Sequence, residues 1–361
     1  MTVADSSPFS WPVRGERLFA VLVFVLVLAL YVRTAAPGIV IEGDGAEYTA
    51  AAVVGGVPHQ PGYSSYMCLA WPLARLVGAE HAARALALLS AFFGALTVAL
   101  AALVVLRLLR RACAAAPPAC AFAASTFGAL TLASTTELWN QSLSAEVYSL
   151  STALLAWVLL LTLASARTDR LMWAALASGL AYGVHYNVGG PTMLLVVLLA
   201  WRERRTLGGR GFLRVSAAFT LGLATFLYLP LRSLADPAID YGDPETPARV
   251  WRALVLADMP TGKAILRPFG LLGEQVLAVL DLVPEQWPLA VLALALLGFG
   301  VACARRELRG FAAAGAGIVL VNYAGILANA NFELEPERIY ELRFLFLPAY
   351  VVVALSAALA F

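Results

Sequence analysis

The chain has 361 residues, of which 61% are hydrophobic, and its mean hydropathy is +0.80, which excludes an ordinary soluble globular protein. The formal net charge is only +2, and the basic residues form short clusters at loop ends, so nothing indicates a nucleic-acid partner. The spacing of the four cysteines, at positions 68, 113, 120 and 303, fits neither a disulfide framework nor a zinc site.

Ten apolar segments follow one another along the chain, and none of them contains Asp, Glu, Lys or Arg. A membrane-spanning helix needs about 20 apolar residues, with a usual range of about 17–25. The fifth and sixth segments are short. The pattern predicts an all-α polytopic membrane protein with about ten transmembrane helices, at residues 18–32, 85–106, 117–136, 147–166, 171–186, 188–201, 215–231, 286–304, 311–328 and 344–361.

Arginine clusters between these segments predict the orientation of the chain, because basic residues stay on the cytoplasmic side of a membrane. With the clusters inside, the inner loops hold 15 of the 25 basic residues and only 5 of the 23 acidic ones. The first segment lacks a small-residue cleavage site and is interpreted as an uncleaved span. One lysine against 24 arginines, with abundant alanine, favours a bacterial plasma (inner) membrane.

The stretch 62–78 decides this orientation, because a further span there would move every later loop to the other side. It is short, follows Pro61, and contains Pro72 and Arg75. We therefore expect an interfacial or re-entrant helix within one large outer loop, a feature that membranes tolerate where protein covers the backbone.

The outer loops are then residues 33–84, 137–146, 186–187, 232–285 and 329–343. Residues 269–283 repeat apolar side chains at helical spacing, which predicts an amphipathic helix on the membrane surface. We expect residues 1–361 to form a single transmembrane domain with no separate soluble domain. The chain ends in an apolar run without a basic flank, so either it is naturally short or a further segment is missing.

Asp44 and Glu47 follow the first span and stand three residues apart, on one face of any helix they share. Near a membrane the lower polarity raises the proton affinity of a carboxylate, which suits a general base acting on a hydroxyl. On spacing alone, two solvated loop acids are the simpler interpretation. A divalent cation could bind there, but no third carboxylate is placed to complete such a site.

The outer loops hold further polar groups that could contact a substrate. They are His59 and Tyr63 in a rigid turn, Glu146 and Tyr148 at the mouth of a span, and His185 and Asn187 at the tip of a helical hairpin. The simpler interpretations are a turn histidine in water, an interfacial tyrosine and an ordinary turn.

Three arginines lie at the outer rim against the inside-positive bias, namely Arg232, Arg338 and Arg343. A planar guanidinium suits a phosphate, although snorkelling to lipid headgroups is an equally good interpretation. Asp243 lies nearby in a proline-stiffened acidic loop. Carboxylates beside cations at a lipid-accessible surface predict one reaction type, in which a lipid phosphate leaves and a carboxylate activates the acceptor.

Seven motifs in order resemble the bacterial membrane proteins related to the animal receptor protein O-mannosyltransferase, within the GT-C glycosyltransferases. They are GDGAEY, HQPGY, WNQSLSAEVY, GLAYGVH, YLPLR, YGDP and ERIYELRFLFLPAY, and the likeness runs from about Arg17 to the chain end. Gln60 stands where the family more often has proline, and Val184 where asparagine is usual.

The resemblance implies a GT-C fold, a polyprenyl-phosphate sugar as donor, and transfer to a hydroxyl of a protein or glycan, such as O-mannosylation, on the non-cytoplasmic side. It implies that Asp44 is the base and Glu47 its partner. The alternative is a lipid or solute transporter or flippase. Ion-coupled transporters usually keep ionisable groups within their spans, and here only His185 lies in one, at its end. A non-catalytic assembly factor for cell-surface polymers is a third interpretation.

Overall fold

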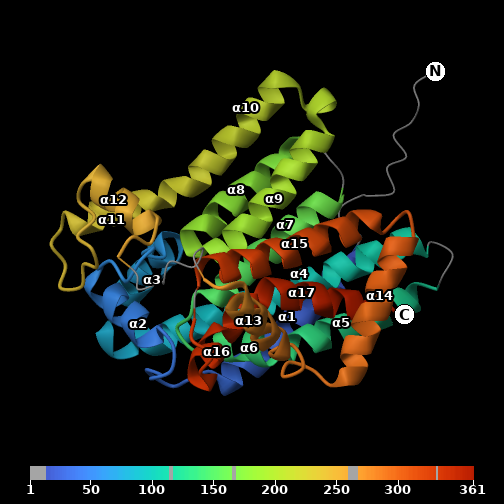
Figure 1. Cartoon of the computed structure of the whole chain (residues 1–361), viewed down its shortest axis with the longest axis horizontal. Coiled ribbons are helices and arrows are strands. Elements are labelled where there is room, and N and C mark those ends of the chain that lie inside the picture. The colour runs from blue at the N-terminus through green and yellow to red at the C-terminus, as the bar shows by residue number, and fades with distance from the viewer. Residues whose placement is uncertain (1–13, 114–116, 165–167, 259–266, 331) are drawn as a thin grey trace.

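A computed structural model describes residues 14–113, 117–164, 168–258, 267–330 and 332–361 (Figure 1). These residues form helices and no β-strand, apart from one isolated bridge between Val57 and Asp240. The order of the helices is α1 (Arg14–Thr34), α2 (Gly45–Val54), α3 (Ser64–Val77), α4 (Ala79–Ala112), α5 (Pro118–Ala133), α6 (Thr136–Gln141), α7 (Tyr148–Ala164), α8 (Thr168–Val184), α9 (Tyr186–Arg202), α10 (Arg204–Leu223), η1 (Ala224–Leu227), α11 (Tyr228–Ser233), α12 (Pro247–Leu254), α13 (Phe269–Asp281), α14 (Leu289–Ala304), α15 (Arg309–Asn329), α16 (Pro336–Leu342), η3 (Arg343–Phe346) and α17 (Leu347–Ala358).

The protein is an all-α membrane protein, as predicted. Each of the ten apolar segments falls on a helix, and five helical stretches of the described chain are long and apolar enough to cross a membrane. These stretches are Gly15–Thr34, Ala79–Ala112, Arg204–Ser233, Arg309–Ala328 and Pro336–Ala358. Shorter apolar helices cover Pro118–Ala133, Tyr148–Leu163 and Leu289–Ala304.

Helix α4 begins earlier than predicted, because Arg84, expected in a loop, lies within it. Its guanidinium donates hydrogen bonds to the carbonyl oxygens of Ala35 (2.6 Å), Ala36 (2.9 Å) and Val32 (3.2 Å). Val32 lies in the last turn of α1, where carbonyl oxygens lack intrahelical partners, and Ala35 and Ala36 directly follow the helix. The arginine therefore caps a neighbouring helix instead of marking a loop.

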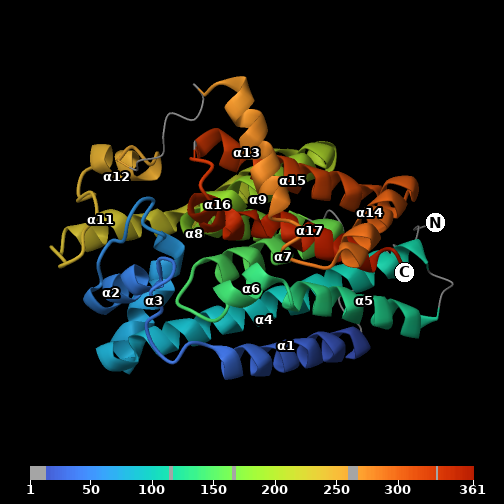
Figure 2. The ribbon, with the colours of Figure 1, turned by 60° about the horizontal axis from the view of Figure 1, so that its bottom comes forward.

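The helices run between two ends of the molecule. Figures 1 and 2 place α2, α3, α11 and α12 at one end, and the start of α1 and the C-terminus at the other. Helix α3 is 14 residues long, about 21 Å of helix, and lies beside α2. Most of the stretch 62–78 is therefore helical, and its position at the membrane interface stays a prediction. Helix α13 also forms, close to its predicted bounds.

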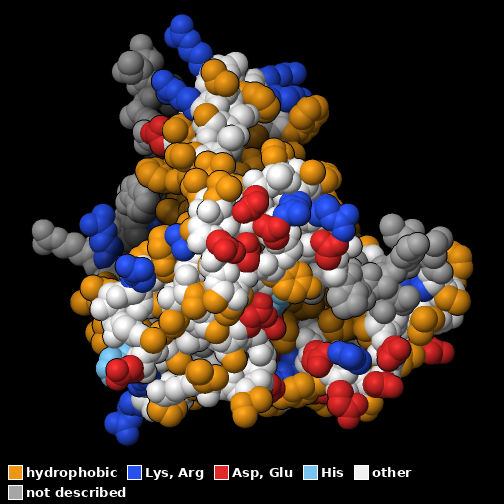
Figure 3. Space-filling model, turned by 90° about the vertical axis from the view of Figure 1, so that its left-hand side faces the viewer, with side chains coloured by type: hydrophobic (Ala, Val, Ile, Leu, Met, Phe, Trp, Pro, Cys, Tyr) orange, Lys and Arg blue, Asp and Glu red, His pale blue; other side chains and the backbone are white. Residues whose placement is uncertain are grey.

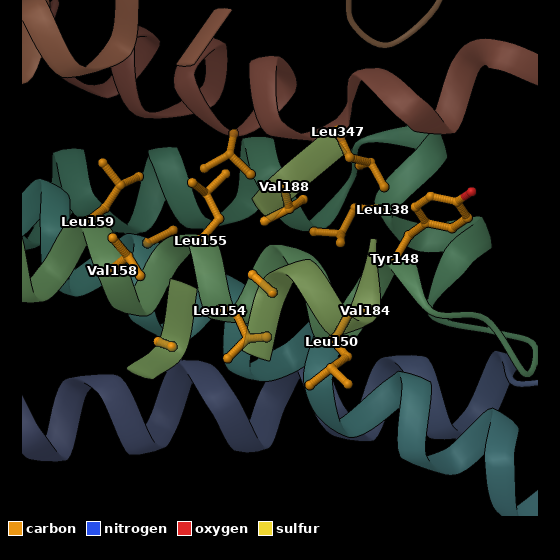
Figure 4. Packing of buried hydrophobic residues seen from close by; sticks show 14 of the residues in the cluster. Leu138, Tyr148, Leu150, Leu154, Leu155, Val158, Leu159, Val184, Val188 and Leu347 are labelled. Atoms are coloured by element: carbon orange, nitrogen blue, oxygen red, sulfur yellow. The ribbon is translucent and has the colours of Figure 1, made fainter. Parts of the chain in front are cut away.

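The core is built around α7, whose side chains meet neighbours from several helices (Figure 4). Leu155, Val158 and Leu159 are completely buried there. Small residues let other helices approach closely: a Cβ at Gly179 of α8 would lie 2.3 Å from the carbonyl oxygen of Phe219 in α10. Such contacts are typical of helix packing in membranes, where lipid supplies no hydrophobic driving force between helices.

Candidate active site

The two glycines around Asp44 let its backbone approach the Ala145–Glu146 pair, which lies 102 residues later in the chain. The amide of Asp44 donates to Oε1 of Glu146 at 3.1 Å. A Cβ at Gly43 would lie 2.6 Å from that oxygen, and one at Gly45 would lie 3.1 Å from the Ala145 carbonyl oxygen. The motifs GDG and AEVY therefore meet in space, and Glu146 fixes the backbone at the start of α2.

Glu47 and His59 form a hydrogen-bonded pair beside Asp44. Both carboxylate oxygens of Glu47 are used: the backbone amide of His59 donates to Oε1 at 2.6 Å, and Nδ1 of His59 lies 2.8 Å from Oε2. The other ring nitrogen, Nε2, lies 2.7 Å from the hydroxyl of Tyr63 and 3.9 Å from Oδ2 of Asp44. Tyr48 donates to the same Asp44 oxygen at 3.2 Å.

Burial and neighbouring charges shift the pKa values of Asp44 and Glu47 in opposite directions. Burial raises the pKa of Asp44, and the nearby His59 only partly offsets this. Burial also acts to raise the pKa of Glu47, but the hydrogen bonds from His59 outweigh it, so this pKa lies below its usual range. For His59, burial alone would lower the pKa, yet the bond to Glu47 and the charge of Asp44 raise it. Asp44 is thus the more basic carboxylate of the two.

Aromatic rings join this cluster to the hairpin between α8 and α9. The centroid of the His185 ring lies 5.9 Å from that of Tyr63 and 5.3 Å from that of Tyr148. Tyr148 in turn packs against Phe344 of η3 at 4.6 Å, and Asn187 donates its side-chain amide to the carbonyl oxygen of Leu345 at 3.0 Å. Four motifs far apart in sequence are therefore in contact around one cluster.

Arg343 lies beside this site, in ion pairs with two carboxylates. Its Nε lies 2.7 Å from Oε1 of Glu137, and its terminal nitrogen lies 3.0 Å from Oε1 of Glu42. The Glu137 side chain is 1% exposed and that of Glu42 is 66% exposed. Burial raises the pKa of Glu137 to about 7 although Arg343 opposes the change. The predicted site residues did not include Glu137, and the available signal was an acid directly beside a predicted span.

Three other predicted residues lie outside this cluster. Arg232 donates to the carbonyl oxygen of Gly55 at 2.7 Å and stacks over Trp71, at the far end of α2 from Asp44. The ten residues of α2 separate the two by about 15 Å. Asp243 is paired with Arg249, and the exposed Arg338 is paired with Glu341 at 3.0 Å.

Gln60 attaches the loop that follows α12 to the loop between α2 and α3. Its side-chain amide donates to Oδ2 of Asp258 at 2.8 Å and accepts from the Asp258 backbone at 3.1 Å. Nearby, the amide of Val57 donates to the Ile239 carbonyl oxygen at 2.9 Å. A Cβ at Gly56 would lie 2.2 Å from that oxygen, so the loop between α11 and α12 is in direct contact there as well.

The face that carries these loops is shown in Figure 3, with acidic side chains over its middle and lower right. Asp44, Glu47 and His59 can each offer a ligand atom within 4.8 Å of the others. The sequence offers no third carboxylate for a cation site here, and in the structure the third possible ligand is His59. Both of its nitrogens already have partners, so a divalent ion would have to displace Glu47 or Tyr63 from one of them.

We expect the ionisation of Glu146 to make the stability of the protein depend on pH. Burial raises the pKa of Glu146 to about 8, against an ordinary value of 4.5. The unfolded chain ionises this group from pH 4.5 upward and the folded chain only near pH 8. The stability of the folded protein should therefore fall as pH rises between these values, by on the order of 5 kcal/mol.

Thermal unfolding of wild type and Glu146→Gln between pH 5 and 8 measures this effect. The amide can still accept the Asp44 hydrogen bond, so the variant should fold and lose much of the slope. Glu337→Gln, on an exposed residue of α16, is the matched control. An unchanged slope in Glu146→Gln would contradict the assignment.

Comparison with known proteins agrees with the sequence motifs. The family model described as the Protein O-mannosyl-transferase TMEM260 N-terminal domain matches residues 44–207. Protein O-mannosyl-transferase TMEM260 from Mus musculus is 29% identical over 257 residues, which are 67% of this chain and 34% of the mouse protein, so the chain aligns with about a third of that relative. No solved structure matches the chain. The motifs and the two matches show that the chain is related to the animal protein O-mannosyl-transferase family.

Proposed function

We propose that the protein is a membrane glycosyltransferase of the GT-C type, which moves a sugar from a polyprenyl-phosphate donor to a hydroxyl of a protein or glycan. The observation that carries the proposal is the cluster of Asp44, Glu47 and His59. Arg343 lies near this cluster, because it forms an ion pair with Glu42, two residues before Asp44. The mouse relative is by name a protein O-mannosyl-transferase, which favours mannose as the sugar.

In the proposed reaction Asp44 removes the proton of the acceptor hydroxyl, and the oxygen attacks the anomeric carbon of the sugar. The bond from that carbon to the phosphate oxygen breaks, and its electron pair leaves with the polyprenyl phosphate. Attack from the side opposite the phosphate inverts the anomeric configuration. The raised pKa of Asp44 supports the role of base, since a base works best with a pKa closer to the working pH.

Arg343 is the best placed of the three rim arginines to hold the phosphate. The Nε atom of Arg343 is paired with the buried Glu137. A terminal nitrogen is paired with the exposed Glu42, and a phosphate could replace Glu42 there. Arg232 lies about 15 Å from Asp44 along α2, which is too far for a phosphate bonded to the reacting carbon. The ring contacts of His185 and Tyr148 connect Tyr63, beside His59, with Phe344, the neighbour of Arg343 in the chain.

We further propose a bacterial plasma membrane with the site on the non-cytoplasmic side, and one transmembrane domain over the whole chain. The distribution of charge supports this orientation. The arginines are concentrated in and beside the short segments that join α4 to α5, α7 to α8, α9 to α10 and α14 to α15, and basic residues of such segments usually face the cytoplasm.

The test is a transfer assay with the purified full chain, radiolabelled polyprenyl-phosphate mannose or glucose, and a membrane extract as the source of acceptor. We expect label on a protein or glycan only with the polyprenyl-linked donor, and none with the nucleotide sugar alone. Loss of label from the donor without transfer to an acceptor would indicate hydrolysis, and movement of intact donor across vesicles without transfer would favour the transporter.

A further inference from the structure

Two asparagines from different helices donate to one backbone oxygen. The side-chain amide of Asn187, in the first turn of α9, donates to the carbonyl oxygen of Leu345 at 3.0 Å. The side-chain amide of Asn322, within α15, donates to the same oxygen at 3.0 Å. Asn187 is half-buried and Asn322 is 1% exposed. We call these two residues the asparagine clamp.

The oxygen that the two amides share lies in η3, the short 3₁₀ segment before α17. In a 3₁₀ helix a carbonyl oxygen accepts a hydrogen bond from the amide three residues later. Three residues after Leu345 is Pro348, which has no amide hydrogen to donate. The clamp therefore supplies donors where the local backbone lacks one, and it ties η3 to α9 and α15 at the same point.

Segment η3 carries Arg343, which is its first residue and lies two residues before Leu345. A second contact fixes the other end of the segment, because the ring centroids of Phe346 and Tyr323 lie 4.5 Å apart and Tyr323 directly follows Asn322. Any shift of η3 moves the backbone from which the Arg343 guanidinium extends. The clamp therefore determines where that guanidinium can reach.

The clamp is not an obvious source of stability. The Oδ1 atoms of Asn187 and Asn322 are both buried and have no hydrogen-bond partner among the described residues. The cost of a buried acceptor without a partner is at least as large as the net gain from one neutral hydrogen bond. The two bonds to Leu345 therefore fix the place of η3 without adding much to the free energy of folding.

We propose that Asn187 and Asn322 are positioning residues, which hold η3 so that Arg343 meets the phosphate of the sugar donor. The inference rests on the proposed function, in which Arg343 binds that phosphate. Neither asparagine touches the donor in this role. A guanidinium binds phosphate through parallel hydrogen bonds of fixed geometry, so a small displacement of η3 weakens donor binding.

Kinetics of label transfer from polyprenyl-phosphate mannose by the purified full chain test the proposal. Leucine is close to asparagine in size, so Asn187→Leu and Asn322→Leu remove the amide donors without leaving a large cavity. Each single variant should raise KM by about threefold, because the other amide still holds the oxygen, and the double variant by more than about tenfold. The value of kcat should change less, because Asp44 is not displaced. An unchanged KM in the double variant would overturn the positioning role.

Ser178→Ala/Thr192→Val is the matched control, because it removes a buried hydrogen bond of 3.1 Å between α8 and α9 that lies outside η3. This control should leave KM unchanged. An equal rise of KM in the two double variants would overturn the positioning role in favour of a general loosening of the helices.

Hydrogen–deuterium exchange of the same full chains tests the clamp without any transfer activity. Peptides that cover residues 343–350 should exchange about tenfold faster in Asn187→Leu/Asn322→Leu than in wild type, the effect of losing about one hydrogen bond. Unchanged exchange would overturn the clamp itself. Faster exchange, in a protein whose wild type transfers no sugar, would support the clamp and count against the proposed function, so the two failures are distinguishable.

Discussion

Replacing Asp44 by Asn should lower the rate of sugar transfer by about 10²–10⁴-fold, the usual contribution of a positioned general base. The amide keeps the size of the side chain and can still accept the hydrogen bond from Tyr48, but it cannot take the acceptor proton. Initial rates of label transfer at saturating donor measure the effect, and donor affinity should change little.

Asp236→Asn is the matched control, since Asp236 is an exposed carboxylate of the loop after α11. Its left-handed backbone, with φ of 50°, suits asparagine. Transfer at the wild-type rate in Asp44→Asn would remove Asp44 as the base. Equal losses in both variants would show that the assay reports expression or folding rather than chemistry.

Replacing Arg343 by Gln should destabilise the protein by about 3 kcal/mol, because Glu137 would be left buried without its counterion. The loss should be larger at pH 8 than at pH 6, since burial raises the pKa of Glu137 to about 7 and the protonated acid tolerates burial. Thermal unfolding in detergent at the two pH values measures both effects.

Two further variants separate stability from function at Arg343. Arg338→Gln breaks an exposed ion pair five residues before Arg343, so it should lower stability far less than Arg343→Gln. Glu137→Gln/Arg343→Gln should recover most of the stability but not the transfer activity, if Arg343 also holds the donor phosphate. Equal melting temperatures of Arg343→Gln and Arg338→Gln would contradict the buried ion pair.

The helical fold was largely predictable from apolar periodicity, because each long run without charges became a helix. Helix ends were less predictable where tertiary contacts decide them. Arg84 resembles a loop residue in the sequence, yet it lies in α4 because the carbonyl oxygens at the end of α1 accept its hydrogen bonds. The sequence around Arg84 does not indicate that the carbonyl oxygens of Ala35 and Ala36 accept its hydrogen bonds.

The candidate site shows the same division. Spacing alone could place Asp44 and Glu47 on one helical face, and the ordered motifs could suggest which loops belong together. The pairing of Glu47 with His59 depends on the turn of the chain through the HQPGY segment, and the burial of Glu137 depends on packing against Arg343, more than 200 residues later. Gln60 has a partner in Asp258 that the sequence did not indicate.

The ion pair between Glu137 and Arg343 also bears on which portion of the chain can stand alone. The family match ends at residue 207, before η3, although Glu137 and Asn187 both have their partners at Arg343 and Leu345. A fragment cut at that boundary would bury a carboxylate with no counterion and an amide with no acceptor. We therefore expect that residues 44–207 do not fold as an independent unit, and that a fragment with these ends misfolds or aggregates.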